Sequence, residues 1–169
     1  MREKDRQRRK QLIYGSPAYR VSEWSLGEAG IWECREPTAG LDEPGAEIDA
    51  VALAVVQAAT EVHRHLGPGY LESVYEEAVA VELQLRSIPF ERQKAIHIDY
   101  KGTRIGEARL DLLVGGKLVV ELMAVESIMP IHRAQIISYL KATGLRVGLL
   151  FNFNVVLLRD GIQRVILSV

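Results

Sequence analysis

The stretch spanning residues 106–123 constrains the fold most, because its pattern is typical of a β-hairpin. Apolar and polar residues alternate up to a Gly-Gly pair, and valine and leucine dominate after it. The two glycines supply the backbone freedom that a tight turn needs. If residues 115–117 form a three-residue loop, Val114 pairs with Leu118, and the register of the whole hairpin follows.

This register predicts which side chains face one another across the hairpin. Asp111 lies opposite Glu121, and Arg109 lies opposite Met123. Because successive strand residues alternate faces, these four residues share one face of the hairpin. The same face also carries Leu113 and Val119, and the other face is wholly apolar, with Leu110, Leu112, Val114, Leu118, Val120 and Leu122.

Two acids that face each other across a hairpin need an explanation, because like charges directly opposite destabilise a sheet. A divalent cation between Asp111 and Glu121 would remove the conflict, since hard cations bind carboxylate oxygens. Two alternatives stay open. One acid is solvated or protonated, or the loop has two residues, which would move Glu121 to the opposite face.

Composition narrows the class of protein. With 169 residues, 48% hydrophobic and 25% charged, the chain resembles one soluble globular domain. We expect no signal peptide and no membrane span, since the first ten residues are charged and no apolar run is long enough. The single Cys34 excludes an internal disulfide and fits a reducing cytoplasm. The net charge of −1 weakens a nucleic-acid-binding function, which usually shows a basic surplus, without excluding it.

The first 46 residues differ from the rest of the chain. They combine a mixed-charge start with segments rich in proline and glycine, and they show no apolar period. This composition predicts that residues 1–46 form a disordered or poorly ordered extension. Residues 47–169 are then expected to form a single domain.

The remainder alternates between helix and strand patterns. Three helices are predicted, with Asp49 as the cap of the first, over about 49–66, 71–86 and 132–143. Strands are predicted in the two arms of the hairpin and over 95–100, 147–151, 155–158 and 164–167. The order α-α-β-β-β-α-β-β-β predicts an α/β fold, a mixed sheet with helices on both faces.

Several motifs, in one order along the chain, resemble a known family. The run Gly69-Tyr-Leu-Glu72-Ser-Val-Tyr75 matches the signature of the bacterial and archaeal GxxExxY proteins. Further similarities to that family lie at His63 and at residues 66–69 and 152–154. The family belongs to the PD-(D/E)XK nuclease superfamily, in the branch resembling RecB nuclease domains. The resemblance extends from Ile48 to the C-terminus and implies a restriction-endonuclease-like mixed β-sheet flanked by helices.

The resemblance also implies a site and a partner. The acid, the E-x-K motif and the Q-x-x-x-Y motif of that branch correspond here to Asp111, Glu121-Leu122-Met123 and Gln135-Ile-Ile-Ser-Tyr139. The two acids would hold Mg²⁺ or Mn²⁺, helped by the Leu122 backbone carbonyl and by Glu72. Gln135 and Tyr139 would steady the site or contact the nucleic-acid backbone. The implied partner is nucleic acid, DNA in the first place, and nucleases of this fold often work as homodimers.

Several of these residues also have a purely structural explanation. Glu72 lies in the first turn of a predicted helix, where the helix dipole favours any acid. Tyr75 and Tyr139 fit half-buried aromatic residues with a hydrated hydroxyl, and Gln135 fits a cap on a loop carbonyl. The four histidines show no convincing metal-ligand spacing.

Met123 is the departure that matters most, because the motif has lysine there. That lysine is a point charge beside the attacking water and the scissile phosphate, and methionine has neither charge nor a useful donor. Three functions stay open. The chain is an impaired nuclease or a nucleic-acid-binding module, or a competent nuclease in which Arg109 replaces the lysine, or a protein-interaction module without metal.

Overall fold

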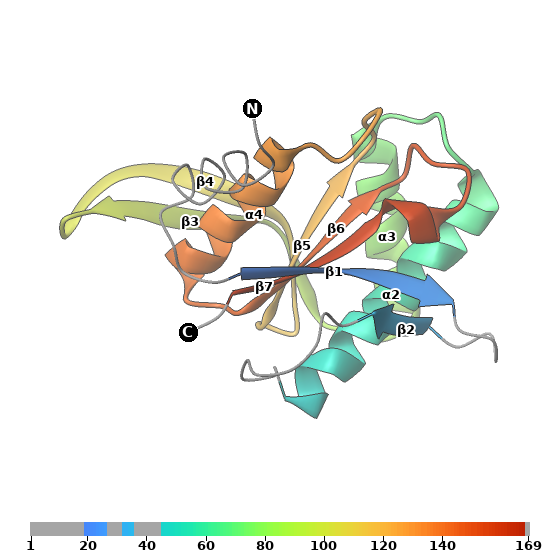
Figure 1. Cartoon of the computed structure of the whole chain (residues 1–169), viewed down its shortest axis with the longest axis horizontal. Coiled ribbons are helices and arrows are strands. Elements are labelled where there is room, and N and C mark those ends of the chain that lie inside the picture. Colours follow the sequence, from blue (N-terminus) through green and yellow to red (C-terminus); the bar gives the residue numbers. More distant parts are fainter. Residues whose placement is uncertain (1–18, 27–31, 36–44, 168–169) are drawn as a thin grey trace, which may run out of the picture.

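A computed structural model describes residues 19–26, 32–35 and 45–167 of the chain (Figure 1). Its elements in chain order are β1 (Tyr19–Leu26), β2 (Trp32–Arg35), α2 (Ala46–Leu66), α3 (Glu72–Leu85), β3 (Phe90–Tyr100), β4 (Thr103–Val114), β5 (Leu118–Met123), α4 (Pro130–Thr143), β6 (Val147–Asn152), the 3₁₀ turn η1 (Leu158–Gly161) and β7 (Ile162–Leu167). The strands form one seven-stranded sheet in the order β2-β1-β7-β6-β5-β4-β3.

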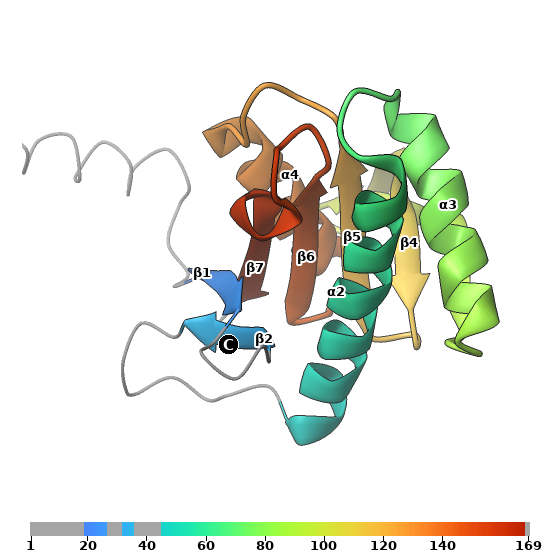
Figure 2. The same ribbon diagram turned by 90° about the vertical axis from the view of Figure 1, so that its right-hand side faces the viewer.

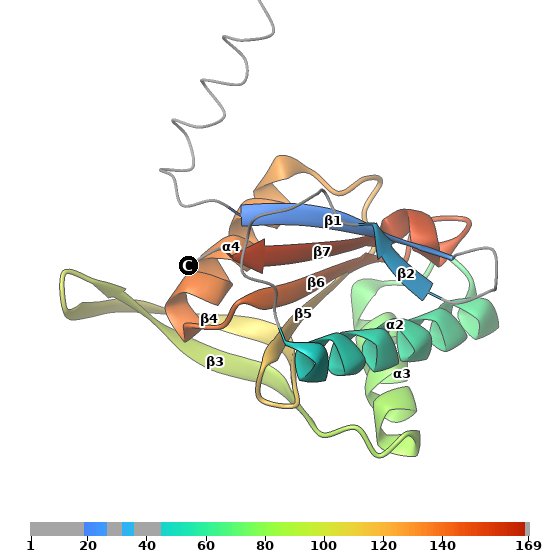
Figure 3. The ribbon, with the colours of Figure 1, turned by 60° about the horizontal axis from the view of Figure 1, so that its bottom comes forward.

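The sheet is mixed and covered on both faces, as the sequence predicts. Strands β5 and β6 pair in parallel, and the other pairs are antiparallel. Helix α4 makes the crossover between β5 and β6, because a parallel pair needs a long connection. Figures 2 and 3 show α2 and α3 on one face of the sheet and α4 on the other. Each face therefore has its own apolar cluster.

The central hairpin has the predicted register. Val114 pairs with Leu118, and both turn glycines have positive φ angles, 59° at Gly115 and 68° at Gly116. This excludes the two-residue loop. The apolar face packs on α2 and α3, except for Leu110, which belongs to the cluster beneath α4. Pairing between β4 and β5 ends at Leu112. The prediction of which side chains face one another assumed a continuous hairpin, so its strand pairing does not hold for the residues of β4 before Leu112.

Two segments from the first 46 residues form strands, which differs from the sequence prediction. Strand β1 pairs antiparallel with β7, and β2 pairs with β1. Without β1, β7 would be an edge strand with a row of free N–H and C=O groups. Strand β1 pairs with this edge. Residues 1–18, 27–31 and 36–44, where the rest of the predicted extension lies, are outside the described residues.

The predicted strand over 155–158 is wrong. The carbonyl of Val155 accepts a hydrogen bond of 2.9 Å from His63 Nε2, and the chain then enters η1. Strand β7 therefore does not pair with residues 155–158, and its partners are β6 and β1. A side chain 92 residues away in sequence thus holds the start of this segment through its backbone carbonyl.

The first helix also begins differently from the prediction. Gly45, and not Asp49, is the residue before its first turn, and the helix starts at Ala46. The Asp49 carboxylate instead accepts a hydrogen bond from the buried Arg164 of β7. This ion pair ties the start of α2 to the sheet.

Candidate active site at the gap between strands β4 and β5

Strands β4 and β5 separate immediately after the Leu112–Val120 pair, and two acids fill the gap. Asp111 Oδ2 accepts a hydrogen bond of 2.8 Å from the backbone N–H of Leu122, in place of a ladder bond. Glu121 Oε1 accepts one of 3.3 Å from the backbone N–H of Asp111. The two carboxylates thus lie together, as the predicted register requires.

The strands separate because each follows a different partner. Strand β4 stays paired with β3 along a long arm, residues 90–114, while β5 stays paired with β6. Figures 1 and 3 show this β3–β4 arm leaving the body of the sheet. The N–H and C=O of one strand residue point toward the same neighbouring strand. The Leu122 carbonyl therefore faces the same gap as the Asp111 carboxylate.

Burial and repulsion by neighbouring acids raise the pKa of both Asp111 and Glu121. Glu121 is only 5% exposed. Its burial, and then the nearby charges of Asp111, Glu72 and Glu76, raise its pKa to about 9. Burial also raises the pKa of Asp111, although the Leu122 N–H acts in the opposite direction. Without a cation Glu121 is therefore protonated at neutral pH, which is one of the alternatives that the sequence left open.

Helix α3 begins at Glu72, an exposed residue whose charge interacts with that of Asp111. The pKa of the Glu72 carboxyl is raised by burial first and by the charge of Asp111 second, so the two groups are within electrostatic reach. Tyr75 fixes the start of this helix: its hydroxyl donates to the Gly67 carbonyl at 2.7 Å and accepts from the Tyr70 N–H at 3.1 Å. Tyr75 is fully buried, and not half-buried with a hydrated hydroxyl. Its role is to hold the turn before α3.

Helix α4 brings Gln135 and Tyr139 to the other side of the gap. Gln135 Nε2 donates a hydrogen bond of 2.8 Å to the Tyr139 hydroxyl. Burial raises the pKa of Tyr139, and the charges of Glu121 and Asp111 add to this effect. The charges of both acids therefore act on the Tyr139 hydroxyl, which is bonded to Gln135.

Met123 and Arg109 occupy different environments from those of the acids. Met123 is 8% exposed and packs in the apolar cluster beneath α4. Arg109 does not pair with Met123, because pairing between β4 and β5 has already ended; it lies opposite Ala95 of β3 and is exposed. Within residues 45–167, the structure shows no hydrogen bond or ion pair for the Arg109 side chain.

Sequence reasoning missed Glu76 and Gln93. Gln93 Nε2 donates to Glu76 Oε2 at 3.0 Å and to Asp111 Oδ1 at 3.5 Å. Glu76 lies one helical turn after Glu72, a spacing that could have marked it. The predicted first strand began at Ala95, so it excluded Gln93, although β3 begins at Phe90.

The donors around the gap are oxygen atoms, the type that binds a hard divalent cation, but there are few of them. Within residues 45–167 and the two N-terminal strands, no three side chains of His, Cys, Asp or Glu lie close enough together to hold a metal ion. Two carboxylates do share the gap, one of them deeply buried without a countercharge. Mg²⁺ commonly binds proteins through one or two carboxylates and keeps water or phosphate oxygens as its other ligands. The residues present therefore fit such an ion.

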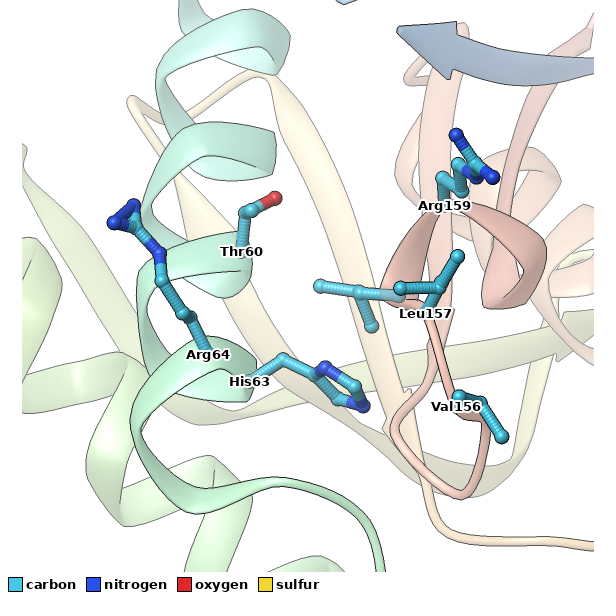
Figure 4. A pocket seen from close by; sticks show the side chains of 7 residues that line it. Thr60, His63, Arg64, Val156, Leu157 and Arg159 are labelled. Atoms are coloured by element: carbon cyan, nitrogen blue, oxygen red, sulfur yellow. The ribbon is translucent and has the colours of Figure 1, made fainter.

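A separate hollow of about 410 Å³ lies between α2 and the segment leading into η1 (Figure 4). Its lining is mainly apolar and comprises Thr60, His63, Arg64, Val156, Leu157, Leu158 and Arg159. The ring of His63 is engaged with the Val155 carbonyl. This explains His63 as a structural residue and not as a member of the acidic site.

Comparison with known families gives one match. The model of the PD-(D/E)XK nuclease superfamily matches residues 49–165, which include every acid and amide of the site described above. Comparison with curated proteins gave no match, and comparison with solved structures gave none either. In the part of the chain that the structure describes, no helix is both long and apolar enough to cross a membrane.

Proposed function

The chain belongs to the PD-(D/E)XK nuclease superfamily, and from this premise we propose that it binds a nucleic acid at the gap between β4 and β5. The proposed reaction is metal-dependent hydrolysis of a phosphodiester, slowed because Met123 stands at the lysine position. The observation that carries the proposal is the shared gap of Asp111 and Glu121, with a backbone N–H fixing each carboxylate. Within the superfamily we assign the chain to the GxxExxY proteins of the RecB-like branch, acting on DNA in the cytoplasm.

In this proposal, the residues around the gap hold a metal ion or contact the phosphate. Asp111, Glu121 and the Leu122 carbonyl would hold Mg²⁺ or Mn²⁺, with Glu72 close by. Such an ion lowers the pKa of bound water and stabilises charge on the scissile phosphate. Tyr139, held by Gln135 and within electrostatic reach of the acids, would donate its hydroxyl to a phosphate oxygen.

Met123 limits the rate in this proposal. Its buried thioether offers no charge and no N–H donor to the attacking water or the phosphate. Loss of one preorganised donor commonly slows a reaction by about a hundredfold to a thousandfold. We therefore expect binding to survive better than cleavage.

Calorimetric titration of the full chain with Mn²⁺ tests the site. We expect the parent to bind, and we expect Asp111→Asn and Glu121→Gln each to weaken binding by about a hundredfold or more, since loss of a ligand exceeds the ~10–100-fold effect of losing an outer partner. The exposed Glu126 serves as the matched control, and Glu126→Gln should bind as the parent does. A parent that binds no Mn²⁺ would contradict the proposal and favour a scaffold for protein contacts.

A competent nuclease with Arg109 in place of the lysine is the second candidate. It is favoured by one observation, the partnerless Arg109 guanidinium two residues before Asp111 on β4. If Arg109 supplies the missing charge, Arg109→Ala should lower residual cleavage by about tenfold or more, because a charge-assisted contact typically contributes ~1.5–3 kcal/mol. Arg104→Ala, which removes an arginine paired with Glu107 on the same strand, should leave the rate unchanged. Equal rates in the parent and Arg109→Ala would eliminate this candidate.

A further inference from the structure

Gln93 of β3 faces the acidic gap from the side opposite Glu121. In the β3–β4 register Arg92 pairs with Leu112 and Lys94 pairs with Leu110, so Gln93 lies across from Asp111. Its side-chain amide donates to Asp111 Oδ1 as well as to Glu76 Oε2. The Leu122 N–H donates to the other oxygen of Asp111. Each oxygen of this carboxylate thus faces an N–H donor from a neighbouring strand, at 2.8 Å from Leu122 of β5 and at 3.5 Å from Gln93 of β3.

The backbone of Gln93 is held in an unusual conformation. Three described residues other than glycine have positive φ angles: Ser87 at 55°, Gln93 at 48° and Lys101 at 50°. Ser87 follows the end of α3 and Lys101 lies in the turn of the β3–β4 arm, where such angles are ordinary. Gln93 alone of the three lies inside a strand. Strain of this kind persists where surrounding contacts hold it, and it is concentrated at functional sites.

Arg92 and Glu76 supply those surrounding contacts. The Arg92 guanidinium bonds Glu76 Oε1 at 3.2 Å and Glu77 Oε2 at 2.8 Å. Glu76 is largely buried, with 13% of its side chain exposed, and its second oxygen accepts the Gln93 amide. A series of side-chain contacts, from Arg92 to Glu76 to Gln93 to Asp111, therefore links α3 and β3 to the acid of β4.

We propose that Gln93 is a positioning residue of the acidic site, whose amide sets the orientation of the Asp111 carboxylate toward a bound cation. The inference rests on the proposed function and adds a residue to it. Met123 cannot donate to the acids from β5, whereas Gln93 donates from β3. A carboxylate has about four acceptor sites, so the two N–H donors leave lone pairs of Asp111 free for a cation. Outer partners of this kind set the affinity of a metal site.

Paired glycine variants of the full chain separate positioning from folding. Gln93→Gly removes the amide and also relieves the positive φ angle, and Lys101→Gly relieves a similar angle in the turn that follows the same strand. The probe is Mn²⁺, titrated by calorimetry, and urea unfolding is measured in parallel with EDTA present. We expect Gln93→Gly to bind Mn²⁺ about 10–100-fold more weakly than the parent. We expect Lys101→Gly to bind as the parent does, and both variants to share one unfolding midpoint that is no lower than that of the parent.

The outcomes distinguish this inference from the proposed function. Mn²⁺ binding that is equal in the parent and Gln93→Gly would overturn the positioning role while leaving the metal site intact. A weaker affinity together with an unfolding midpoint below that of Lys101→Gly would show a structural role and would also overturn it. Absence of Mn²⁺ binding in the parent itself would overturn the proposed function, and the inference with it.

Discussion

Replacing Met123 with lysine is expected to raise metal-dependent cleavage by about a hundredfold or more, the usual contribution of one well-placed charged donor. Met123 lies two residues after Glu121 on β5, in the apolar cluster that includes Ile136 of α4. A lysine can keep its aliphatic stem in that cluster and extend its ammonium toward the carboxylate of Glu121. The same charge would lower the pKa of Glu121 and keep it ionised.

The assay measures cleavage of labelled single-stranded DNA, double-stranded DNA and RNA in the presence of Mn²⁺. Met123→Leu keeps an apolar side chain of similar volume and should not gain activity. Met129→Lys places the same new charge at a methionine that is 52% exposed, and it should not gain activity either. Activity gained by Met123→Lys should disappear when Asp111→Asn is added. A Met123→Lys protein that binds Mn²⁺ yet cleaves no faster than the parent would contradict the explanation of impaired catalysis.

The cation-free protein should become less stable as the pH rises from about 4.5 to about 9. In the unfolded chain Glu121 ionises near its ordinary pKa, whereas burial keeps it protonated in the folded chain up to about pH 9. The folded state therefore binds more protons over this interval, and the free energy of unfolding falls as the pH rises. At pH 8 the expected destabilisation is on the order of a few kcal/mol. Glu121→Gln should remove most of it.

Urea unfolding in EDTA at pH 5 and pH 8 measures this effect. The parent should lose stability between the two values, and Glu121→Gln should lose much less and be the more stable protein at pH 8. The raised pKa values of Asp111 and Glu72 act in the same direction, so a smaller slope should remain. Glu126→Gln should keep the full slope of the parent. An equal slope in the parent and Glu121→Gln would contradict the deep burial of Glu121.

The proximity of Asp111 and Glu121 could be predicted because it depends on local information. Two glycines fix the loop length, and alternation of side chains then fixes the register for several residues on either side. The same local reasoning fails for Arg109, because it assumes that β4 and β5 remain paired. Which neighbour a strand follows depends on the competing pairs β3–β4 and β5–β6, and these are long-range choices.

Other features could not be predicted because distant residues determine them. The positive φ angle of Gln93 is unusual for a strand residue, and its side chain is held by Glu76 from α3. The Val155 carbonyl after Asn154 is bonded to the distant His63, and Tyr19–Leu26 forms a strand against the edge of β7. The helices were predicted more accurately, since their apolar period and end signals are local.

Strand β1 also has a practical consequence for handling this protein. The superfamily match begins at residue 49, and a fragment cut there would lack both N-terminal strands. Its β7 would then present a bare edge, including the apolar Val165 and Ile166, to any other chain in solution. Such edges promote edge-to-edge association and aggregation. The expressed chain should therefore begin before Tyr19, so that β1 covers the edge of β7.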